Sequence, residues 1–127
     1  LREELRRRFD SVDAQKTTFR ASGDERRLPV EIQTALLRIC QESLTNIRKH
    51  ASATEVDVEL VYNEDAVYLG IRDDGVGFDV EAVRKGGTQG GFGLTGMKQR
   101  ASLLRGSLTV TSETHRGTQV EVRLPTK

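Results

Sequence analysis

The sequence has no tryptophan, one cysteine and few aromatic residues, and its charges nearly cancel. The single cysteine, Cys40, excludes an intrachain disulfide and is compatible with a reducing compartment, so we expect a cytoplasmic domain. No apolar run approaches the roughly 18 residues that a membrane span needs, and no secretory signal peptide is visible. The net charge of +1 excludes a global basic field that would attract nucleic acid or an anionic membrane.

The length and composition of the sequence suit one small folded domain. The 127 residues are enough for a single modest core, and we expect them to form one domain. Hydrophobic residues make up 35% of the sequence, so the core must be built on Val, Leu and Ile. The basic cluster Arg6, Arg7 and Arg8 follows Glu3 and Glu4, which favours a solvated helix face over a nucleic-acid patch. The chain begins with Leu, so we expect a fragment of a longer protein.

Hydrophobic periodicity predicts helices and hairpins. Pro29 suits the first turn of a long helix, and Gly106 suits the end of a later one. The predicted segments are helices over 1–9, 29–50 and 95–104, an edge strand over 16–21, and hairpin strands over 56–60, 67–71, 107–111 and 118–124. This order predicts an α+β fold, a two-layer sandwich with a mixed, mostly antiparallel sheet and helices on one face.

Polar residues of the long predicted helix gather beside its apolar stripe. At 100° per residue, Glu42, Asn46 and Lys49 fall within about 60° of one another, whereas His50 falls inside the stripe. A carboxylate and an amide at the rim of a core can face a cleft. On spacing alone, however, an ordinary amphipathic helix with polar shoulders explains them better than a site does.

Two predicted strands carry a polar residue on their apolar face. Asp73 is in phase with the inward residues of its strand, and an unpaired buried carboxylate is costly. Asp73 therefore either caps a turn or receives hydrogen bonds from a ligand, and Gly75 and Gly77 let another group approach the backbone. Thr118 is also in phase with apolar residues, although a strand-end residue after Gly117 is the simpler explanation.

The glycine-rich segment 90–97 leads directly into a patterned helix, which argues against a flexible linker. Gly91, Gly93 and Gly96 match G-x-G-x-x-G, and backbone N–H groups at a helix N-terminus suit a phosphate. The match does not indicate a dinucleotide-binding fold, because no strand directly precedes the loop and no βαβ unit surrounds it. No P-loop lysine motif is present either.

Taken together, four motifs resemble those of the GHKL ATPases, in family order. Residues 41–51 resemble the N box, 73–78 the first glycine box (D-x-G-x-G), 91–97 the second glycine box, and 116–118 the terminal Gly-Thr element. The Lys-His-Ala ending of the first motif and the run 93–100 resemble the histidine-kinase subfamily of nitrate/nitrite sensors and DesK-type thermosensors. The resemblance covers nearly the whole domain and implies the GHKL fold and an ATP-binding catalytic domain.

The resemblance implies ATP and Mg²⁺ as ligands, and it assigns residues to the nucleoside end of a site. Asp73 would accept a hydrogen bond from the adenine amino group, and Thr118 would support it through water. Gly75 and Gly77 would shape the adenine slot.

At the phosphate end, Asn46 would bind Mg²⁺, which keeps several waters and bridges the phosphates. Lys49 would contact phosphate, and Glu42 would act as general base or orient the incoming imidazole. The ATP lid would be formed by Gly91, Gly93 and Leu94.

The implied reaction transfers the γ-phosphoryl group to a histidine on a separate dimerisation and phosphoacceptor domain, whose downstream partner is a response regulator. This chain has only His50 and His115, and neither has the context of an acceptor helix. We therefore expect the fragment to bind ATP without phosphorylating itself, and residues 1–10 to form the junction to the missing segment.

Three alternatives remain open at this point. A serine kinase of the anti-sigma-factor type shares the fold, but residues 49–51 and the fragment-like start disfavour it. The intact set of Glu42, Asn46, Asp73 and Gly93 disfavours a degenerate signalling module. A gyrase-like or mismatch-repair ATPase normally needs a longer lid and a transducer domain, for which the chain has no room.

Overall fold

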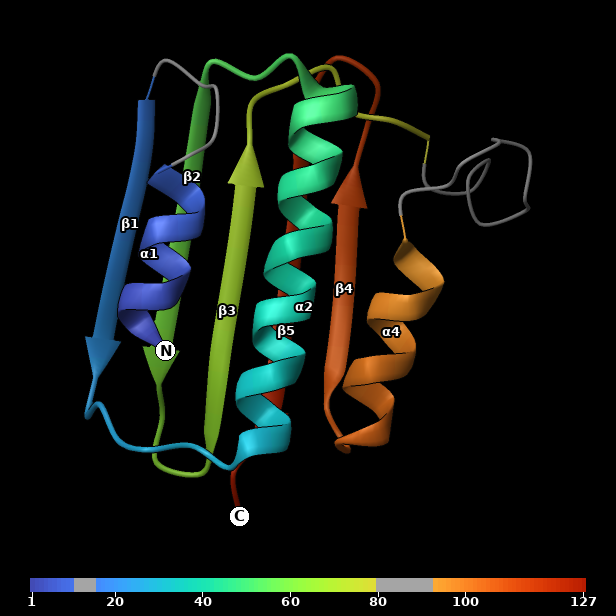
Figure 1. The fold of residues 1–127 in the computed structure, drawn as a ribbon. Helices are drawn as coiled ribbons and strands as arrows, with labels where there is room; N and C mark the ends of the chain where they lie inside the picture. The colour runs from blue at the N-terminus through green and yellow to red at the C-terminus, as the bar shows by residue number, and fades with distance from the viewer. Residues whose placement is uncertain (11–15, 80–92) are drawn as a thin grey trace.

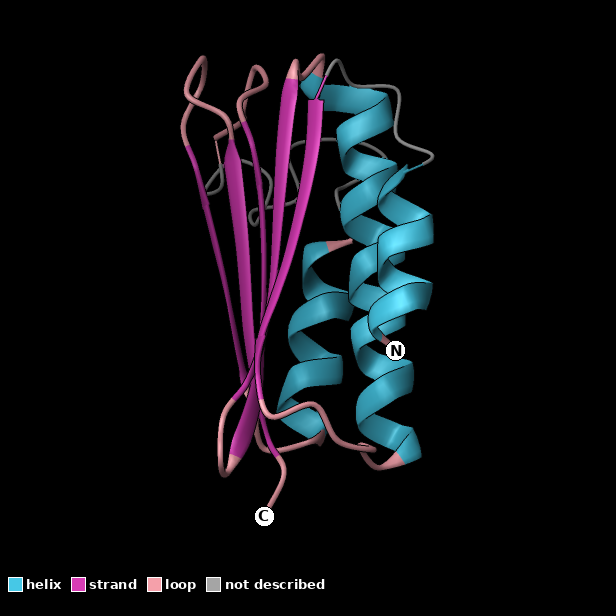
Figure 2. Cartoon of the chain, turned by 90° about the vertical axis from the view of Figure 1, so that its left-hand side faces the viewer, coloured by secondary structure: helices cyan, strands magenta, loops and turns pink. Residues whose placement is uncertain are grey.

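The computed structural model describes residues 1–10, 16–79 and 93–127. In these ranges, one five-stranded sheet carries helices on a single face (Figures 1 and 2). The elements in chain order are α1 (Arg2–Asp10), β1 (Lys16–Gly23), α2 (Val30–Asn46), the π-helical turn η1 (Ile47–Ala51), β2 (Glu55–Tyr62), β3 (Ala66–Asp73), α4 (Leu94–Leu103), β4 (Ser107–Ser112) and β5 (Thr118–Pro125). The predicted α+β sandwich is confirmed.

The sheet has the strand order β1-β2-β3-β5-β4, with β1 parallel to β2 and all other pairs antiparallel. The two predicted hairpins are confirmed as β2–β3 and β4–β5, and β1 is an edge strand as expected. The register pairs Asp73 of β3 with Thr118 of β5. Because directly opposite residues on neighbouring strands share a face, these two polar side chains stand side by side on the helix-covered face.

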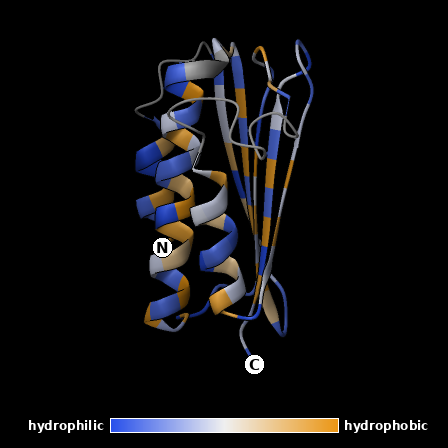
Figure 3. Cartoon of the chain, turned by 90° about the vertical axis from the view of Figure 1, so that its right-hand side faces the viewer, coloured by the Kyte–Doolittle hydropathy of each residue, from blue (hydrophilic) through white to orange (hydrophobic). Residues whose placement is uncertain are grey.

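The core fills the space between the sheet and the helices. Both layers carry hydrophobic residues at intervals along their elements (Figure 3). Helix α1 contributes Leu5 and Phe9, which are fully buried in the same core as the rest of the chain. Its three consecutive arginines, in contrast, are exposed, which confirms the predicted solvated helix face.

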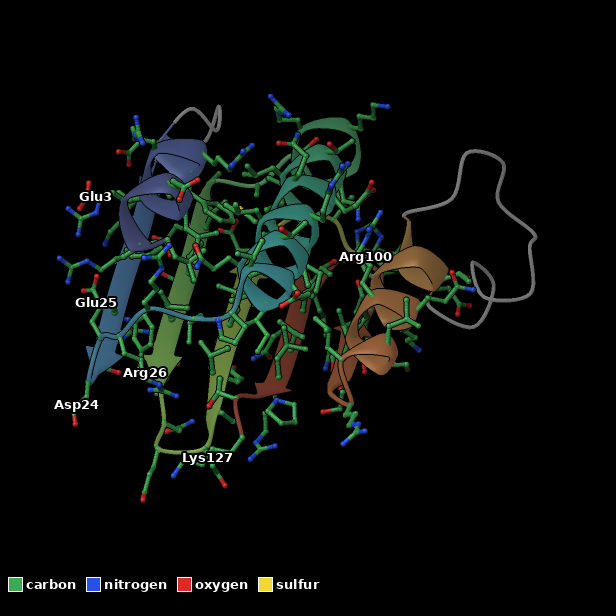
Figure 4. All side chains as sticks on the ribbon, turned by 60° about the horizontal axis from the view of Figure 1, so that its bottom comes forward. Glu3, Asp24, Glu25, Arg26, Arg100 and Lys127 are labelled. Atoms are coloured by element: carbon green, nitrogen blue, oxygen red, sulfur yellow. The ribbon has the colours of Figure 1, made fainter. Side chains whose placement is uncertain are left out.

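The loop that precedes α2 and the C-terminus meet at one end of the sandwich, where Glu25, Arg26 and Lys127 lie (Figure 4). Arg26 Nη2 donates a hydrogen bond of 2.9 Å to Thr126 Oγ1, and its guanidinium lies 6.0 Å from the ring centroid of Tyr62. This contact fastens the end of the last strand to the segment that leads into α2.

The long helix differs from its prediction at both ends. Pro29 is the residue before the first helical turn, with a ψ of 146°, and it does not lie inside that turn. After Asn46 the α-helix becomes the π-helical turn η1, which ends at Ser52 in a left-handed conformation. A π-turn holds more residues than an α-turn, so the 100° spacing that placed Lys49 beside Glu42 does not apply beyond Asn46.

The end of α4 also differs from its prediction. Arg105, with a φ of 61°, takes the left-handed position that was expected for a glycine. The N–H of Gly106 bonds to the carbonyl of Ala101 at 2.8 Å, which closes the helix. Gly106 is needed for a different reason, because a Cβ there would lie 2.4 Å from the carbonyl oxygen of Arg123.

Candidate functional site

A pocket opens between the two layers at the end where α2 and β3 finish and β5 and α4 begin (the upper end in Figure 1). Every element around it contributes side chains, most of which are apolar. The lining residues are Ser43, Asn46, Ile47, Ile71, Asp73, Gly77, Phe78, Leu94, Val110, Thr118 and Val120. The fold therefore brings together five of the residues that the sequence singled out: Asn46, Asp73, Gly77, Leu94 and Thr118.

Asp73 is the buried charge of this pocket, with only 6% of its surface exposed. Burial raises the pKa of its carboxyl group, hydrogen bonds from the backbone of Gly75 and Thr118 lower it, and the neighbouring Asp74 raises it. The net result is a raised pKa. The Gly75 N–H lies 2.8 Å from Oδ1, so Gly75 acts through Asp73 and does not line the pocket itself. A carboxylate that is costly to bury suits a partner that donates hydrogen bonds.

Gly77, the second glycine after Asp73, packs against the turn between β4 and β5. Gly77 has a φ of 66°, and a Cβ there would lie 2.0 Å from the carbonyl oxygen of Glu113. The same turn brings Gly117 against β3, because its Cβ would lie 2.1 Å from the carbonyl oxygen of Asp73. The predicted close approach to the backbone is confirmed at Gly77, where the approaching group is the chain itself.

Ser112, at the end of β4, connects three parts of the site. Its Oγ accepts a hydrogen bond from the Phe78 N–H at 2.9 Å and donates one to the Gly117 carbonyl at 2.9 Å. It also lies 2.8 Å from Oγ1 of Thr118, its cross-strand partner. The sequence pattern alone did not single out Ser112. Its phase with the inward Val110 and its position before the hairpin turn were the signals that could have found it.

Glu42 and Gly93 meet beside the pocket. A Cβ built on Gly93 would lie 2.4 Å from Oε2 of Glu42, so the carboxylate rests against this glycine. Gly93, with a φ of 67°, is the N-cap residue of α4, and Leu94 begins the helix. A carboxylate near a helix N-terminus is electrostatically favourable. Glu42 itself does not line the pocket. Its neighbours on the same helix, Ser43 and Asn46, both do.

The remaining expectations for the site have different outcomes. Lys49 is exposed on η1 and does not line the pocket, because the π-helical turn after Asn46 departs from the α-helical spacing that placed it beside Glu42. Gly91 and the side chain of His50 lie outside the described residues.

Asp74, next to the buried carboxylate, has a structural role that the sequence did not indicate. Its Oδ1 accepts hydrogen bonds from the N–H groups of Thr54 and Glu55 at 2.8 and 2.9 Å, and its Oδ2 accepts one from the Thr54 hydroxyl at 2.6 Å. These hydrogen bonds lower the pKa of Asp74. The side chain thus ties the end of β3 to the segment between η1 and β2.

Residues 31–127 match the family model described as "Histidine kinase-, DNA gyrase B-, and HSP90-like ATPase". The signal transduction histidine-protein kinase/phosphatase DegS of Bacillus subtilis is 35% identical over 112 residues, which are 87% of this chain and 29% of DegS. The corresponding kinase/phosphatase UhpB of Salmonella typhimurium is 44% identical over 102 residues, 80% of this chain and 19% of UhpB. This chain therefore spans less than a third of the length of these curated relatives.

Among solved structures, the blue-light activated histidine kinase of Erythrobacter litoralis EL346 superposes with a TM-score of 0.77 at 22% identity. The match covers 99% of this chain and 42% of that one, and at this identity it supports the fold. Within the described ranges, no helix is long and apolar enough to cross a membrane.

Proposed function

The chain belongs to the histidine kinase-, DNA gyrase B- and HSP90-like ATPase family, and we propose that it is the ATP-binding catalytic domain of a sensor histidine kinase. The observation that carries this proposal is the pocket, in which a buried carboxylate lines a mostly apolar slot at the edge of the core. Helix α1 shares the core, which supports treating residues 1–127 as one domain. We further propose that residues 1–10 join it to the acceptor segment.

The polar end of the pocket suits adenine. The carboxylate of Asp73 would accept a hydrogen bond from the exocyclic amino group, and Thr118 would bind the same edge of the base through water. The flat ring would lie between apolar side chains of the helical wall and the sheet, such as Ile47 and Val120, which line the slot from opposite layers.

The opposite end would hold the phosphates near the start of α4. Backbone N–H groups at a helix N-terminus attract anions, and we propose that Gly91, Gly93 and Leu94 form the lid there. Lys49 would reach the phosphates from η1, where it is free to extend because it is exposed.

The residues present fit a Mg²⁺ ion that is bound mainly by ATP. In the described ranges no cluster of three acidic, His or Cys side chains could hold a metal. Mg²⁺ that bridges phosphates keeps several waters and needs only one or two protein ligands. Asn46 lines the pocket and would supply one such oxygen. When bound, the ion would neutralise charge on the phosphates.

We propose that Glu42 supports the chemical step. The acceptor imidazole nitrogen would attack the γ-phosphorus, the bond to the β–γ bridging oxygen would break, and ADP would leave. Glu42 would act as general base or orient the imidazole, and either role requires it to lie within hydrogen-bond reach of the imidazole proton. The domain otherwise contributes positioning, which is the main protein contribution to phosphoryl transfer.

The acceptor histidine belongs, in this proposal, to a separate dimerisation domain of the same kinase, and the phosphoryl group then passes to a response regulator. We place the domain in the cytoplasm, where ATP is available and a buried free thiol such as Cys40 stays reduced.

Phosphorylation in trans tests this function. The chain is mixed with γ-labelled ATP, Mg²⁺ and the phosphoacceptor segment of DegS, and we expect acid-labile, base-stable label on that segment. Glu42→Gln should reduce the rate by about 100-fold or more while ATP binding persists. Glu31→Gln, on the exposed first turn of the same helix, is the matched control and should change nothing.

Label on serine would instead identify a protein-serine kinase. ATP binding without any transfer of label to that segment would indicate a signalling module without kinase activity.

A further inference from the structure

Ser112 is the residue at the site whose role no motif explains. It does not line the pocket, yet its hydroxyl contacts Thr118, which does. Three partners surround a group that has one proton to donate: the Phe78 N–H, the Gly117 carbonyl and the Thr118 hydroxyl. The direction of each hydrogen bond can therefore be worked out from chemistry alone.

The backbone partners fix the proton of Ser112. A backbone N–H can only donate and a carbonyl can only accept, so Phe78 donates to Ser112 and Ser112 donates its single proton to Gly117. The Ser112 oxygen is then only an acceptor towards Thr118. Since these two oxygens lie 2.8 Å apart, the Thr118 hydroxyl must be the donor of that hydrogen bond.

The consequence reaches the pocket. Thr118 uses its proton on Ser112, so it offers a ligand only lone pairs. Its cross-strand partner Asp73, when ionised, is likewise only an acceptor. The polar end of the pocket thus accepts hydrogen bonds and has no side-chain donor from these two residues.

We propose that Ser112 is a positioning residue that orients the Thr118 hydroxyl and thereby sets the base specificity of the pocket. An acceptor-only edge favours a purine with an amino group at position 6 over one with a carbonyl oxygen there. The Asp73 carboxylate and that oxygen would both be acceptors, and a water held by Thr118 and Asp73 would use both its protons on these two residues, so that it too could only accept from the base. This inference rests on the proposed nucleotide site and adds to it a residue that selects between bases without touching them.

Removing the Ser112 hydroxyl reverses this orientation. In Ser112→Ala, the Thr118 proton loses its acceptor and can turn towards the pocket, where it can donate to the bridging water. That water then has a proton free to donate to a carbonyl oxygen of the base. Phe78 and Gly117 lose a hydrogen bond as well, but that loss weakens all nucleotides alike. The specific signature of the proposed role is therefore the ratio of two affinities and not either affinity alone.

The experiment compares ADP and IDP, which differ at position 6, by calorimetry at constant pH and Mg²⁺. We expect the native chain to prefer ADP, and Ser112→Ala to reduce that preference by about tenfold, the value of one hydrogen bond. Ser112→Thr retains a hydroxyl and should restore the preference. Ser107→Ala, an exposed serine at the start of the same strand, should leave it unchanged.

A second variant keeps the test decisive if Ser112→Ala folds poorly. Thr118→Val removes the oriented hydroxyl itself, so it should lower the preference, and adding Ser112→Ala to it should cause no further change in the ratio. Equal weakening of ADP and IDP by Ser112→Ala, or an additive effect on the ratio in the double variant, would overturn the inference. If the native chain binds neither nucleotide, the proposed function fails first, and the inference with it.

Discussion

The interface between the helices and the sheet has two ends that differ in character. One end, which we call the packed end, is fully buried. It includes Leu36 of α2, Val67 of β3 and Leu124 of β5, which belong to the same core. At the other, the pocket end, the same strands carry Asp73 and Thr118 on the same face. Strand β3 thus changes from core to site within six residues, with no change of register or direction. One continuous interface therefore provides the core and, in the proposed function, the binding site.

Stability is expected to depend most on the packed end. Leu36→Ala should lower the free energy of unfolding by about 3 kcal/mol, because a large buried side chain is lost and a cavity remains. Denaturant unfolding measures this change. Nucleotide affinity of the folded variant should stay within about twofold of native, since distant sites act independently. A matching fall in affinity would show that the two ends are coupled.

Two glycine-to-alanine substitutions, with expected effects of intermediate size on stability, sharpen the comparison. Gly77→Ala, at the pocket end, should destabilise the fold by about 2 to 3 kcal/mol, because a φ of 66° and the Glu113 carbonyl both oppose a Cβ. Gly96→Ala is the matched control, since nothing lies within 4 Å of its Cβ position on α4. That change should stabilise the helix by about 0.5 to 1 kcal/mol. Thermal unfolding of both variants measures these changes in stability. Similar changes for Gly77→Ala and Gly96→Ala would contradict the account.

The smallest expected effects come from the two neighbouring aspartates, which should respond to pH with opposite signs. Burial raises the pKa of Asp73, so the folded state disfavours its ionised form. The contribution of Asp73 to stability is fully present below the pKa that it has in the unfolded chain. It is lost as the pH rises through the higher pKa that Asp73 has in the folded domain. Asp73→Asn should therefore slightly stabilise the nucleotide-free domain at neutral pH, and the gain should disappear in acid.

Asp74 provides the opposite case. Its pKa is lowered by hydrogen bonds from Glu55 and Thr54, so its contribution is present above the unfolded pKa and is lost as pH falls through the folded pKa. Asp74→Asn should destabilise the domain at neutral pH and have no effect in acid. Unfolding curves from neutral to acidic pH measure both variants, and parallel pH profiles for them would contradict the assigned environments.

Much of the fold followed from period-two and helical patterns. Val67, Leu69 and Ile71 fixed the inward face of β3, and the same phase placed Asp73 on it. The parallel pairing of β1 is a long-range contact that alternation cannot specify. The π-turn after Asn46 was missed, because a sequence read at helical spacing has no signal for one extra residue per turn.

The site was less accessible to prediction than the fold. Asp73 and Thr118 could be found because a polar residue in an apolar row is unusual. Ser112 was missed because a serine before a hairpin turn is common, and its role depends on contacts with Phe78 and Gly117, which only the folded chain brings together.

The most direct test of the central claim is calorimetric binding of a non-hydrolysable ATP analogue in the presence and absence of Mg²⁺. The native chain, Asp73→Asn and the neighbouring control Asp74→Asn are compared at the same pH. We predict Mg²⁺-dependent binding by the native chain, a loss of about 100-fold or more in Asp73→Asn, and near-native affinity in Asp74→Asn. Absence of binding by the native chain, or equal binding by Asp73→Asn, would contradict the assignment of this pocket to adenine.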